Sequence, residues 1–462
     1  MNPTKQNASD LTQGDILKKL ILVATPIMAT SLVQMTHNLV DIFWLSRLSS
    51  GAVAAGGGAG MYLWLSMALL FIGRMGAEIG VSQNIGKGDP VRAQNFAQNA
   101  FTLAIVLGVF YGLFLIVART QLVGFFNIDE PEIVQLTKNY LVYVAFAIPF
   151  MYTNAVATGT FTGFGNTKVP FYINSAALLV NIAISPIFIF VFGLGVIGAA
   201  VSTVIAQFVG FLLFVYALKR YKRRPFEKFR MLILPKKLYI KQIFKWGIPI
   251  ALESALFTSL TLITTRFVAE FGVGALAVQR VGSQIEALSW LVGGGFASAV
   301  TAFTGQNIGA GKFHRVRIGF KISVTVMASW GLFISLVMFF FAGPIIGIFL
   351  NDPLELEMGI YYMRILAFMQ IFACLEGVAA GCFRGRGLTV QPSVTSITFN
   401  ALRVPLAYIL SRGPLGLNGI WLAFTIGAAF RGSCMVIWYI INSKKMPTQT
   451  AIGEQCHSNL KE

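Results

Sequence analysis

The sequence contains little charge. Only 12% of its 462 residues are Asp, Glu, Lys or Arg, against about 25% in a typical soluble domain. So few charged side chains cannot cover a water-facing surface, which excludes an ordinary soluble fold. Among the charged residues the acidic ones are fewer, with 18 Asp and Glu against 36 Lys and Arg. The apolar content of 56%, with 40 Phe and 46 Gly, favours an all-α polytopic membrane protein instead.

Histidine and cysteine are also rare. The three histidines are not clustered, and the four cysteines include no C-x-x-C pair. No metal-binding spacing and no nucleophile–base motif is present, so we expect neither an enzyme nor a bound cofactor. The polar start "MNPTKQNASDLTQGD" lacks a signal-peptide pattern, so we expect the first helix to insert without cleavage.

Long apolar segments follow one another along the chain. A membrane helix needs about 20 mostly apolar residues, and about twelve segments meet this length. They lie near 17–45, 53–82, 95–118, 138–160, 168–193, 195–218, 242–269, 274–306, 317–342, 358–382, 390–411 and 417–441. An even number of spans places both termini on the same side of the membrane.

Basic residues gather in alternate loops. The clearest cases are "KRYKRRPFEKFRMLILPKK" (219–237) and "GAGKFHRVR" (309–317). Basic loops stay in the cytoplasm, so we expect both termini there, in a chain of the cytoplasmic (inner) membrane. Topology thus explains the net charge of +18, and we expect no nucleic-acid partner. The long basic loop favours contact with anionic headgroups, which makes membrane lipids expected partners.

The sequence repeats itself over half its length. "QNIGKGD" begins at Gln83 and "QNIGAGK" at Gln306, and 306 − 83 = 223. Pro26 precedes Pro249 by the same 223 positions. "GTFTGFGNTKVP" (159–170) matches "GCFRGRGLTVQP" (381–392) at a distance of 222. Several stretches in one register indicate two pseudo-symmetric six-helix halves.

Six spans per half make this a parallel repeat, in which the halves commonly flank a central path and give alternating access by rocking. A channel could also be built twice, but the chain shows no selectivity filter or repeated ring of charges. We therefore expect five parts. They are a cytoplasmic N-terminal tail (1–16), a six-helix bundle (17–218), a basic cytoplasmic linker (219–241), a second six-helix bundle (242–441) and a cytoplasmic tail (442–462).

Ionisable residues inside apolar spans are costly, so each is a functional candidate. Asp41 ends the run "LVQMTHNLVD", in which Gln34, His37 or Asn38, and Asp41 form one polar helical stripe. A structural hydrogen-bond network would explain this stripe too. We prefer Asp41 as a cation or proton site, with Gln34, His37 and Asn38 as candidate substrate contacts.

The second half does not repeat these charges. The position equivalent to Asp41 is Thr264, because 41 + 223 = 264. The second half carries Glu253 and Glu376 instead. This asymmetry predicts that ion binding is divided unequally between the halves. We expect Glu253 and Glu376 to face a water-accessible interior, with Glu376→Gln weakening transport but not folding. Further candidate substrate contacts in this half are Gln284 and Glu286.

Taken together, these motifs resemble the multidrug and toxic compound extrusion family over roughly residues 15 to 442. The resemblance rests on the Pro-led first span ending in "NLVD", the two "QNIG" loops, the "GFGN" and "RGRG" turns, "NIAISPIF" and "LEGVAAGCFRGRG". It implies two bundles in a V that open alternately to either side. It also implies antiport, in which small organic and often cationic drugs leave as Na⁺ or H⁺ enters; we expect a monomer.

The resemblance also assigns ion-coupling residues. Asp41 matches the family's first-helix aspartate, and Glu376 lies where many members carry an acid. Polar positions that accompany the aspartate correspond to Asn154, Asn181 and Thr203. Two departures stand out. Ser185 precedes Pro186 where some members have an aspartate, and Glu253 lies about one turn before the glutamate of some members.

Two questions stay open at the level of sequence. Asp41 with oxygens from Asn181 and Thr203 would suit Na⁺, which prefers oxygen ligands, whereas a lone buried carboxylate would suit H⁺. The main rival function is a flippase for lipid-linked precursors from the same superfamily. Such a path needs a cationic lining, for which Arg266, Arg403 and Arg431 are available.

Overall fold

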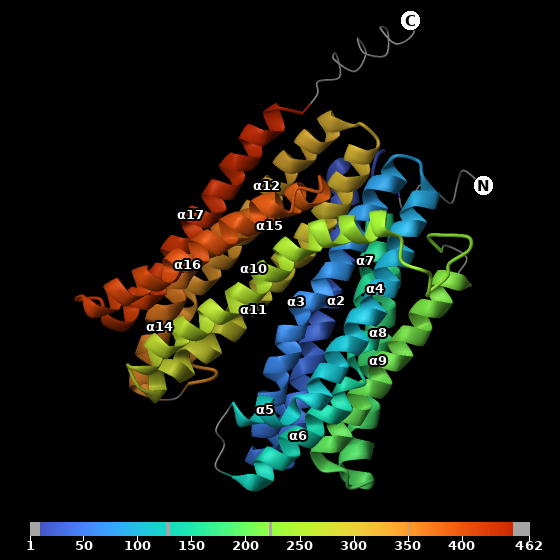
Figure 1. The fold of residues 1–462 in the computed structure, drawn as a ribbon. Coiled ribbons are helices and arrows are strands. Elements are labelled where there is room, and N and C mark those ends of the chain that lie inside the picture. Colours follow the sequence, from blue (N-terminus) through green and yellow to red (C-terminus); the bar gives the residue numbers. More distant parts are fainter. Residues whose placement is uncertain (1–9, 126–129, 221–223, 351, 447–462) are drawn as a thin grey trace, which may run out of the picture. The chain divides into compact units, whose positions relative to one another are not determined.

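The computed structural model describes residues 10–125, 130–220, 224–350 and 352–446, except for the side chains at 38, 42, 50, 53, 54 and 288. Within these ranges every regular element is a helix (Figure 1). The first group of helices is α2 (Ile16–Ser46), α3 (Ser50–Gly86), α4 (Pro90–Val117), α5 (Arg119–Gly124), α6 (Pro131–Ala145), α7 (Ile148–Phe164), α8 (Lys168–Pro186), the π-helix η1 (Ile187–Val191) and α9 (Gly195–Lys219). The second group is α10 (Lys237–Ala269), α11 (Val273–Gly309), α12 (Phe313–Phe340), α13 (Ala342–Ile346), α14 (Pro353–Ala367), α15 (Met369–Gly385), α16 (Val390–Arg412) and α17 (Gly416–Lys444).

Eleven of the twelve predicted spans coincide with helices that are long and apolar enough to cross a membrane. Nine are single helices or, for α8 with η1, one continuous run, and two are bent pairs in the part of the chain described. The pairs are α6 with α7, bent by 46°, and α14 with α15, bent by 41°. Pro149 lies in the first turn of α7 and has no N–H with which to continue the ladder of α6.

The twelfth predicted span, 390–411, is the helix α16, but it falls outside this apolar group. Its sequence "VQPSVTSITFNALRVPLAYILSR" mixes hydroxyl and amide side chains with Arg403 near its middle. Polar side chains in a helix among membrane spans must face protein or water rather than lipid. α16 therefore turns its polar face, with Ser393, Ser396 and Asn400 buried, into its bundle, and it packs along α17.

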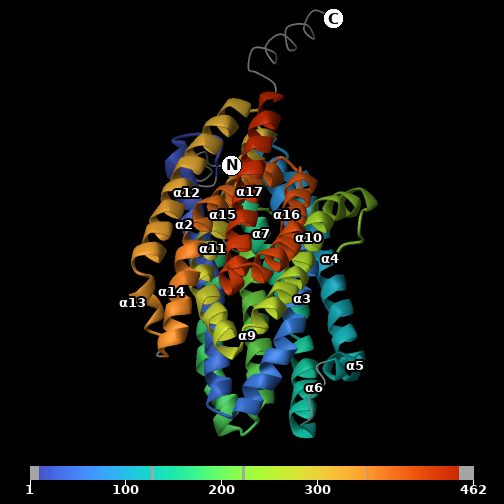
Figure 2. The same cartoon turned by 90° about the vertical axis from the view of Figure 1, so that its left-hand side faces the viewer.

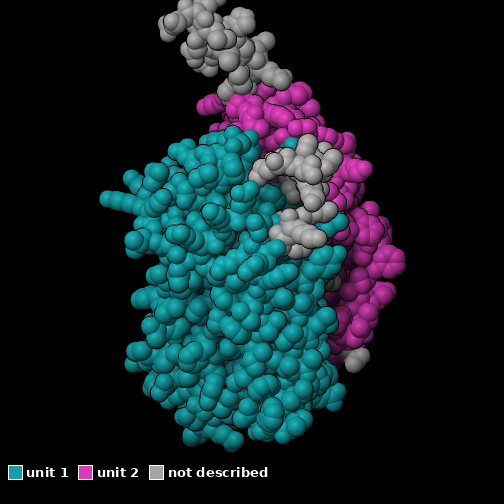
Figure 3. Space-filling model, turned by 90° about the vertical axis from the view of Figure 1, so that its right-hand side faces the viewer, with its two compact units in different colours: residues 1–10, 29–251 teal, residues 11–28, 252–462 magenta. Residues whose placement is uncertain are grey.

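The helices form two compact units. Unit 1 contains residues 10 and 29–251, and unit 2 contains residues 11–28 and 252–446 of the described chain, as Figure 3 colours them. Residues 16–28 of α2 therefore pack in unit 2 and residues 29–46 in unit 1, whereas residues 237–251 of α10 pack in unit 1 and residues 252–269 in unit 2. Both helices are labelled in Figures 1 and 2. These units are defined by packing, whereas the predicted halves 17–218 and 242–441 follow the repeat, so the repeat boundaries stay a prediction.

Equivalent glycines hold equivalent helix pairs together in the two units. A Cβ atom on Gly163 of α7 would lie 2.6 Å from the carbonyl oxygen of Glu78 on α3. A Cβ atom on Gly385 of α15 would lie 2.6 Å from the carbonyl oxygen of Thr301 on α11. The two carbonyls are 301 − 78 = 223 positions apart, which is the register of the sequence repeat. Only glycine permits this backbone approach, a common device of membrane helix pairs, and the contact explains why both turns keep it.

The second "QNIG" stretch holds the start of the described chain. The Leu11 N–H donates to Gln306 Oε1 at 3.0 Å, and Asn307 Nδ2 donates to the Leu11 carbonyl at 3.1 Å. Lys312 Nζ donates to the Thr12 carbonyl at 2.9 Å. Leu11 itself is buried in the core of unit 2. Residues 11 and 12, which belong to the predicted N-terminal tail (1–16), therefore pack as part of unit 2.

Candidate functional site

Unit 1 places two of the predicted ion-coupling residues, Thr203 and Asn181, beside the carboxylate of a third, Asp41. Asp41 lies on the second part of α2, and its Oδ2 is 3.5 Å from Thr203 Oγ1 of α9. His37 Nδ1, one helical turn earlier, is 3.5 Å from the same oxygen. Asn181 of α8 is fully buried and faces the carboxylate. We call these four residues the Asp41 cluster.

Hydrogen bonds within the protein leave much of the Asp41 cluster unsatisfied. Thr203 carries a single hydroxyl proton, and the Ala199 carbonyl, at 3.0 Å, is the nearer acceptor. Asp41 Oδ1 and His37 Nε2 have no hydrogen-bond partner among the described residues, and the Asn181 amide, which faces the Asp41 carboxylate, bonds to no other described group. Buried polar atoms are normally paired, because an unpaired one costs free energy. The two acceptor oxygens, Asp41 Oδ1 and Asn181 Oδ1, can therefore take a cation or a proton.

The backbone around the Asp41 cluster is held by short polar contacts. Ser185 Oγ donates to Ser202 Oγ at 2.9 Å and ties α8 to α9 beside the cluster. Ser202 is the neighbour of Thr203 in sequence, and Ser185 follows Asn181 by one turn. The departure from the family pattern at Ser185 thus has a structural role, since it fixes the two helices that carry the cluster's oxygens.

The fourth predicted residue of this half, Asn154, lies outside the Asp41 cluster. Asn154 Nδ2 donates to the carbonyl and to Oε1 of Gln207, at 3.0 and 3.1 Å. Gln207 follows Thr203 by one turn of α9, so the Asn154 contact continues the polar face of α9 beyond the cluster. Sequence reasoning did not identify Gln207, because the sequence does not show which residue a lone glutamine in an apolar span contacts.

The other candidate residues on α2 differ in how exposed their side chains are. His37 joins the cluster as described above. Gln34 is exposed on α2, so its side chain is available to solvent or ligand. The Asn38 side chain lies outside the described residues. The polar stripe predicted from the sequence therefore holds for His37 and Asp41 and is not tested at Asn38.

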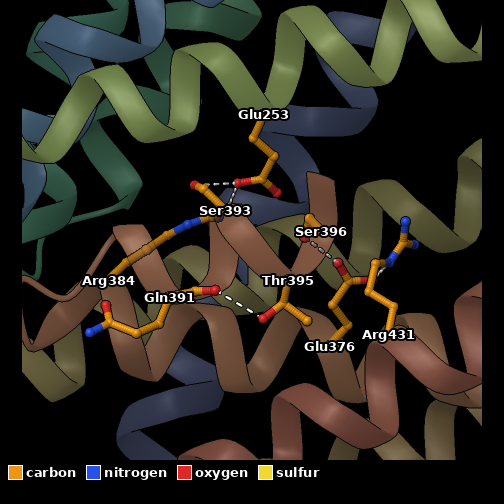
Figure 4. Close-up of polar contacts among 8 residues, drawn as sticks. All are labelled: Glu253, Glu376, Arg384, Gln391, Ser393, Thr395, Ser396 and Arg431. Carbon is orange, nitrogen blue, oxygen red and sulfur yellow. Dashed lines mark hydrogen bonds and ion pairs between the residues drawn. The ribbon is translucent and has the colours of Figure 1, made fainter. Parts of the chain in front are cut away.

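In unit 2 the carboxylate of Glu253 is paired. Its Oε2 accepts from Ser393 Oγ at 2.8 Å and lies 3.5 Å from Arg384 Nη2 (Figure 4). The three residues come from α10, α16 and α15, and the charged side chains keep 18% and 22% exposure. Arg384 belongs to the repeated "GCFRGRG" turn, yet its link to Glu253 spans 131 residues, which no local pattern predicts.

The second acid of unit 2, Glu376, is paired more closely. Arg431 Nε of α17 lies 2.7 Å from Glu376 Oε2, and Ser396 Oγ donates to Glu376 Oε1 at 3.0 Å (Figure 4). Arg431 Nη1 also donates to Asn400 Oδ1 at 2.7 Å. We call these four residues the Glu376 network. Its ion pair argues against the expectation that Glu376→Gln leaves folding intact, because the substitution would leave the arginine without its counter-charge.

Glu286 and Gln284 lie on different faces of α11. Glu286 is buried and accepts a hydrogen bond from the Tyr362 hydroxyl of α14 at 2.5 Å. Tyr362 packs edge-on against Trp421 of α17, with ring centroids 5.1 Å apart. Gln284 is exposed. The structure therefore does not bring these two predicted substrate contacts together, and Glu286 lies in the helix packing of unit 2.

The described carboxylates of the two units differ in their partners. Both Glu253 and Glu376 have an arginine within 4.0 Å. For Asp41 the one basic group that comes so near, among the described side chains, is His37. Of these three predicted ion-coupling carboxylates, Asp41 is thus the one without an arginine beside it.

A comparison with protein families decides what kind of protein carries this arrangement. The MatE family model matches residues 26–187 and 249–409. The chain belongs to the MatE family. The two MatE matches begin at Pro26 and Pro249, which are 249 − 26 = 223 positions apart, so each half carries its own copy of the family's module. This confirms the resemblance and the duplication inferred from sequence.

Curated MatE-like relatives extend over most of both chains. A protein described as probable multidrug resistance protein NorM from Thermotoga maritima is 28% identical over 440 residues, covering 92% of this chain and 92% of the relative. Probable multidrug resistance protein YpnP from Bacillus subtilis is 28% identical over 439 residues, covering 94% and 96%. The chain is thus similar to its relatives over nearly the whole length of each.

Solved structures give the same fold. The structure described as the outward-facing conformation of a multidrug resistance MATE family transporter of the MOP superfamily matches with a TM-score of 0.89 at 22% identity. The match covers 96% of this chain and 99% of that one. The predicted fold, an all-α polytopic membrane protein, is therefore confirmed. The chain is a multi-pass membrane transporter of the MatE family rather than an enzyme.

Proposed function

We propose that this transporter exports small organic cations across the cytoplasmic membrane, driven by the entry of Na⁺ or H⁺, and that Asp41 is the coupling carboxylate. The observation that carries this proposal is the Asp41 cluster. A carboxylate, a hydroxyl and an amide come together in unit 1, while hydrogen bonds within the protein satisfy few of their atoms. The names of the curated relatives, multidrug resistance proteins, support the substrate class.

The chemistry of the Asp41 cluster suits either coupling ion. For Na⁺, the carboxylate, the Thr203 hydroxyl and the Asn181 amide oxygen supply hard oxygen ligands. The Thr203 proton is directed to the Ala199 carbonyl, which leaves a hydroxyl lone pair for the cation. For H⁺, the proton binds Asp41 itself, and the protonated carboxyl then donates to a neighbouring oxygen.

Ion binding would drive transport by changing the balance between two packings of the unit. A neutralised Asp41 no longer repels electron-rich oxygens and no longer attracts His37, so its neighbours on α8 and α9 rearrange. A ligand shifts such a balance only by its differential affinity for the two states. Rocking of the two repeats between inward-open and outward-open states then carries the substrate. In this scheme Gln34 and His37 are candidate substrate contacts near the coupling site.

The arginine pairing in unit 2 supports export of cations over flipping of lipid-linked precursors. A phosphate substrate needs free cationic groups, but Arg431 is bonded to Glu376 and Arg384 lies beside Glu253. Arg403 lies against the rings of Phe424 and Phe257, 4.5 and 5.9 Å from their centroids. Two of the three arginines named for a cationic path, Arg403 and Arg431, are therefore already in contact with other groups, whereas Asp41 offers negative charge to a cation.

Dye efflux from proteoliposomes tests this proposal, with the Na⁺ and pH gradients imposed separately. We expect one gradient to drive export of an organic cation such as ethidium, and a phosphorylated lipid-linked substrate not to move. The test variant is Asp41→Asn, which should export no dye under that gradient. Its matched control is Asp89→Asn, because Asp89 is the exposed N-cap of α4, a position where asparagine serves as well as aspartate. Efflux driven by neither gradient, or gradient-driven movement of the lipid-linked substrate alone, contradicts the proposal.

A further inference from the structure

The basic linker of unit 1 is an ordered strap with two different faces. We define the strap as residues 224–236, between α9 and α10. On its inner face Phe226 and Phe229 are buried, with stacked rings whose centroids lie 6.1 Å apart. Phe229 also meets Phe101 of α4 edge-on at 5.6 Å. Buried aromatic contacts of this kind fix the strap to the surface of its own unit.

Backbone hydrogen bonds fix the path of the strap along α4. The Ile233 N–H donates to Thr102 Oγ1 at 3.2 Å, and the Lys236 N–H donates to Asn99 Oδ1 at 2.8 Å. At the other end, Gln94 Nε2 donates to the Lys228 carbonyl. The strap is therefore anchored at three levels of one helix, and its outward side chains have a defined direction.

The outer face of the strap carries exposed leucines. Leu232 is 67% and Leu234 is 91% exposed, while Met231 and Ile233 between and beside them are partly covered. This alternation is that of an extended segment with one face turned outward. Nothing in the described chain covers these two side chains, and leucine in water is unfavourable. Leu238, at the start of α10, continues the apolar surface with 70% exposure.

The position of the strap along α4 indicates whether these leucines meet water or lipid. Asn99 and Thr102 lie on the same helical face as Val106, Phe110 and Leu113, at spacings of three and four residues. The last three are 56%, 67% and 56% exposed, as expected for a face turned to lipid. The strap therefore lies where the apolar face of α4 begins, about one turn (~5 Å) before Val106. This depth corresponds to the boundary between headgroups and acyl chains.

Exposed cations accompany the leucines. Residues 224–237 contain five basic side chains and one acidic one, a net charge of 5 − 1 = +4. The exposed basic residues are Arg224, Lys228, Arg230, Lys236 and Lys237; the acid is Glu227. A surface that joins apolar side chains to cations at this depth complements an anionic phospholipid, whose phosphate and acyl chain present both features.

We propose that the strap is a binding site for anionic phospholipid of the cytoplasmic leaflet. Leu232 and Leu234 enter the acyl boundary, and the neighbouring cations, Arg230 and Lys236 foremost, contact lipid phosphates. A neutral lipid satisfies the leucines but not the cations, and free phosphate satisfies the cations but not the leucines. Only the anionic lipid can contact both the leucines and the cations of the strap.

The test measures lipid binding to the full chain in detergent, without any transport. Three probes are compared: phosphatidylglycerol, phosphatidylcholine and inorganic phosphate. We expect phosphatidylglycerol to bind most tightly. The paired variant Arg230→Gln with Lys236→Gln should weaken phosphatidylglycerol binding by at least about tenfold, since each surface cation contributes roughly fivefold near an anionic surface. The Lys236 N–H that bonds Asn99 is kept in this variant, so the strap stays attached.

Two further variants keep the proposal falsifiable. The paired variant Leu232→Ser with Leu234→Ser should lower the affinity for both lipids severalfold and leave the weak affinity for inorganic phosphate unchanged. Lys87→Gln removes an exposed cation from another loop of unit 1 and should leave phosphatidylglycerol affinity as in the parent. Unchanged phosphatidylglycerol binding in both paired strap variants overturns the proposal. Inorganic phosphate binding as tightly as phosphatidylglycerol overturns it as well.

Discussion

Replacing Arg431 with glutamine should destabilise the transporter more than replacing Arg431 and Glu376 together. The single change removes the guanidinium at 2.7 Å from Glu376 Oε2 and the donor to Asn400 Oδ1 at 2.7 Å. The Glu376 carboxylate keeps its hydrogen bond from Ser396 but loses its counter-charge. The double change leaves two neutral amides, which can bond to each other across the same gap.

The size of the effect follows from burial. Removing one partner of a buried ion pair costs about 3–5 kcal/mol. Arg431 and Glu376 retain 11% and 15% exposure, which places the single variant near the lower limit, at about 3 kcal/mol. The double variant loses only the difference between a charged and a neutral hydrogen bond, about 1 kcal/mol. The double variant should thus be about 2 kcal/mol more stable than the single one.

The assay is unfolding of the purified protein in mixed micelles with increasing sodium dodecyl sulfate, followed by tryptophan fluorescence. The pair of Arg412 with Glu270 is the matched control, because its atoms also lie close, at 2.9 Å, but its side chains are 59% and 47% exposed. Arg412→Gln should cost no more than about 1 kcal/mol. The reasoning is refuted if Arg431→Gln is no more destabilising than Arg412→Gln, or if the double variant is less stable than Arg431→Gln.

Two other predictions concern the repeat. Gly163→Ala and Gly385→Ala should each cost about 1–3 kcal/mol in the same assay, because the added Cβ overpacks a backbone contact in either unit. Gly57→Ala, where a Cβ meets nothing within 4 Å, should be neutral or stabilising; equal losses at all three positions would show that close approach is not the cause. Asn307→Ala removes the amide that holds the Leu11 carbonyl, so the N-terminal segment should be cut faster in limited proteolysis, and an unchanged cleavage rate would rule out this anchoring.

Much of the fold is predictable from sequence because membrane spans and the repeat are local or periodic properties. The predicted segment 195–218 coincides with α9, and the 223-residue register recurs in the contacts of Gly163 and Gly385. The apolar pattern was less informative for α16, because the polar side chains of this helix pack against protein and lower its overall apolar character. The anchoring of residues 11 and 12 to unit 2 was also missed, since the segment reads as a polar tail and its partners lie 295 or more residues away.

The site was predictable only in part. A carboxylate in an apolar span is visible in the sequence, so Asp41 could be selected, and the resemblance supplied Asn181 and Thr203. The partners of Glu253 and Glu376 could not be selected, because an arginine elsewhere in the chain pairs by tertiary packing that no spacing encodes. Glu376 was therefore predicted as an ion-coupling residue without any partner, and the structure adds its ion pair with Arg431.

The most direct test of the central claim is gradient-driven dye efflux by Asp41→Asn in proteoliposomes. Asparagine keeps the shape of the side chain and its contact with Thr203, but it cannot carry the negative charge or exchange a proton. We predict that the variant reaches the membrane and folds as the parent does, binds the dye, and exports none under the gradient that drives the parent. Export by Asp41→Asn at the parent rate, under the same gradient and with equal protein in the vesicles, would contradict the assignment of Asp41 as the coupling residue.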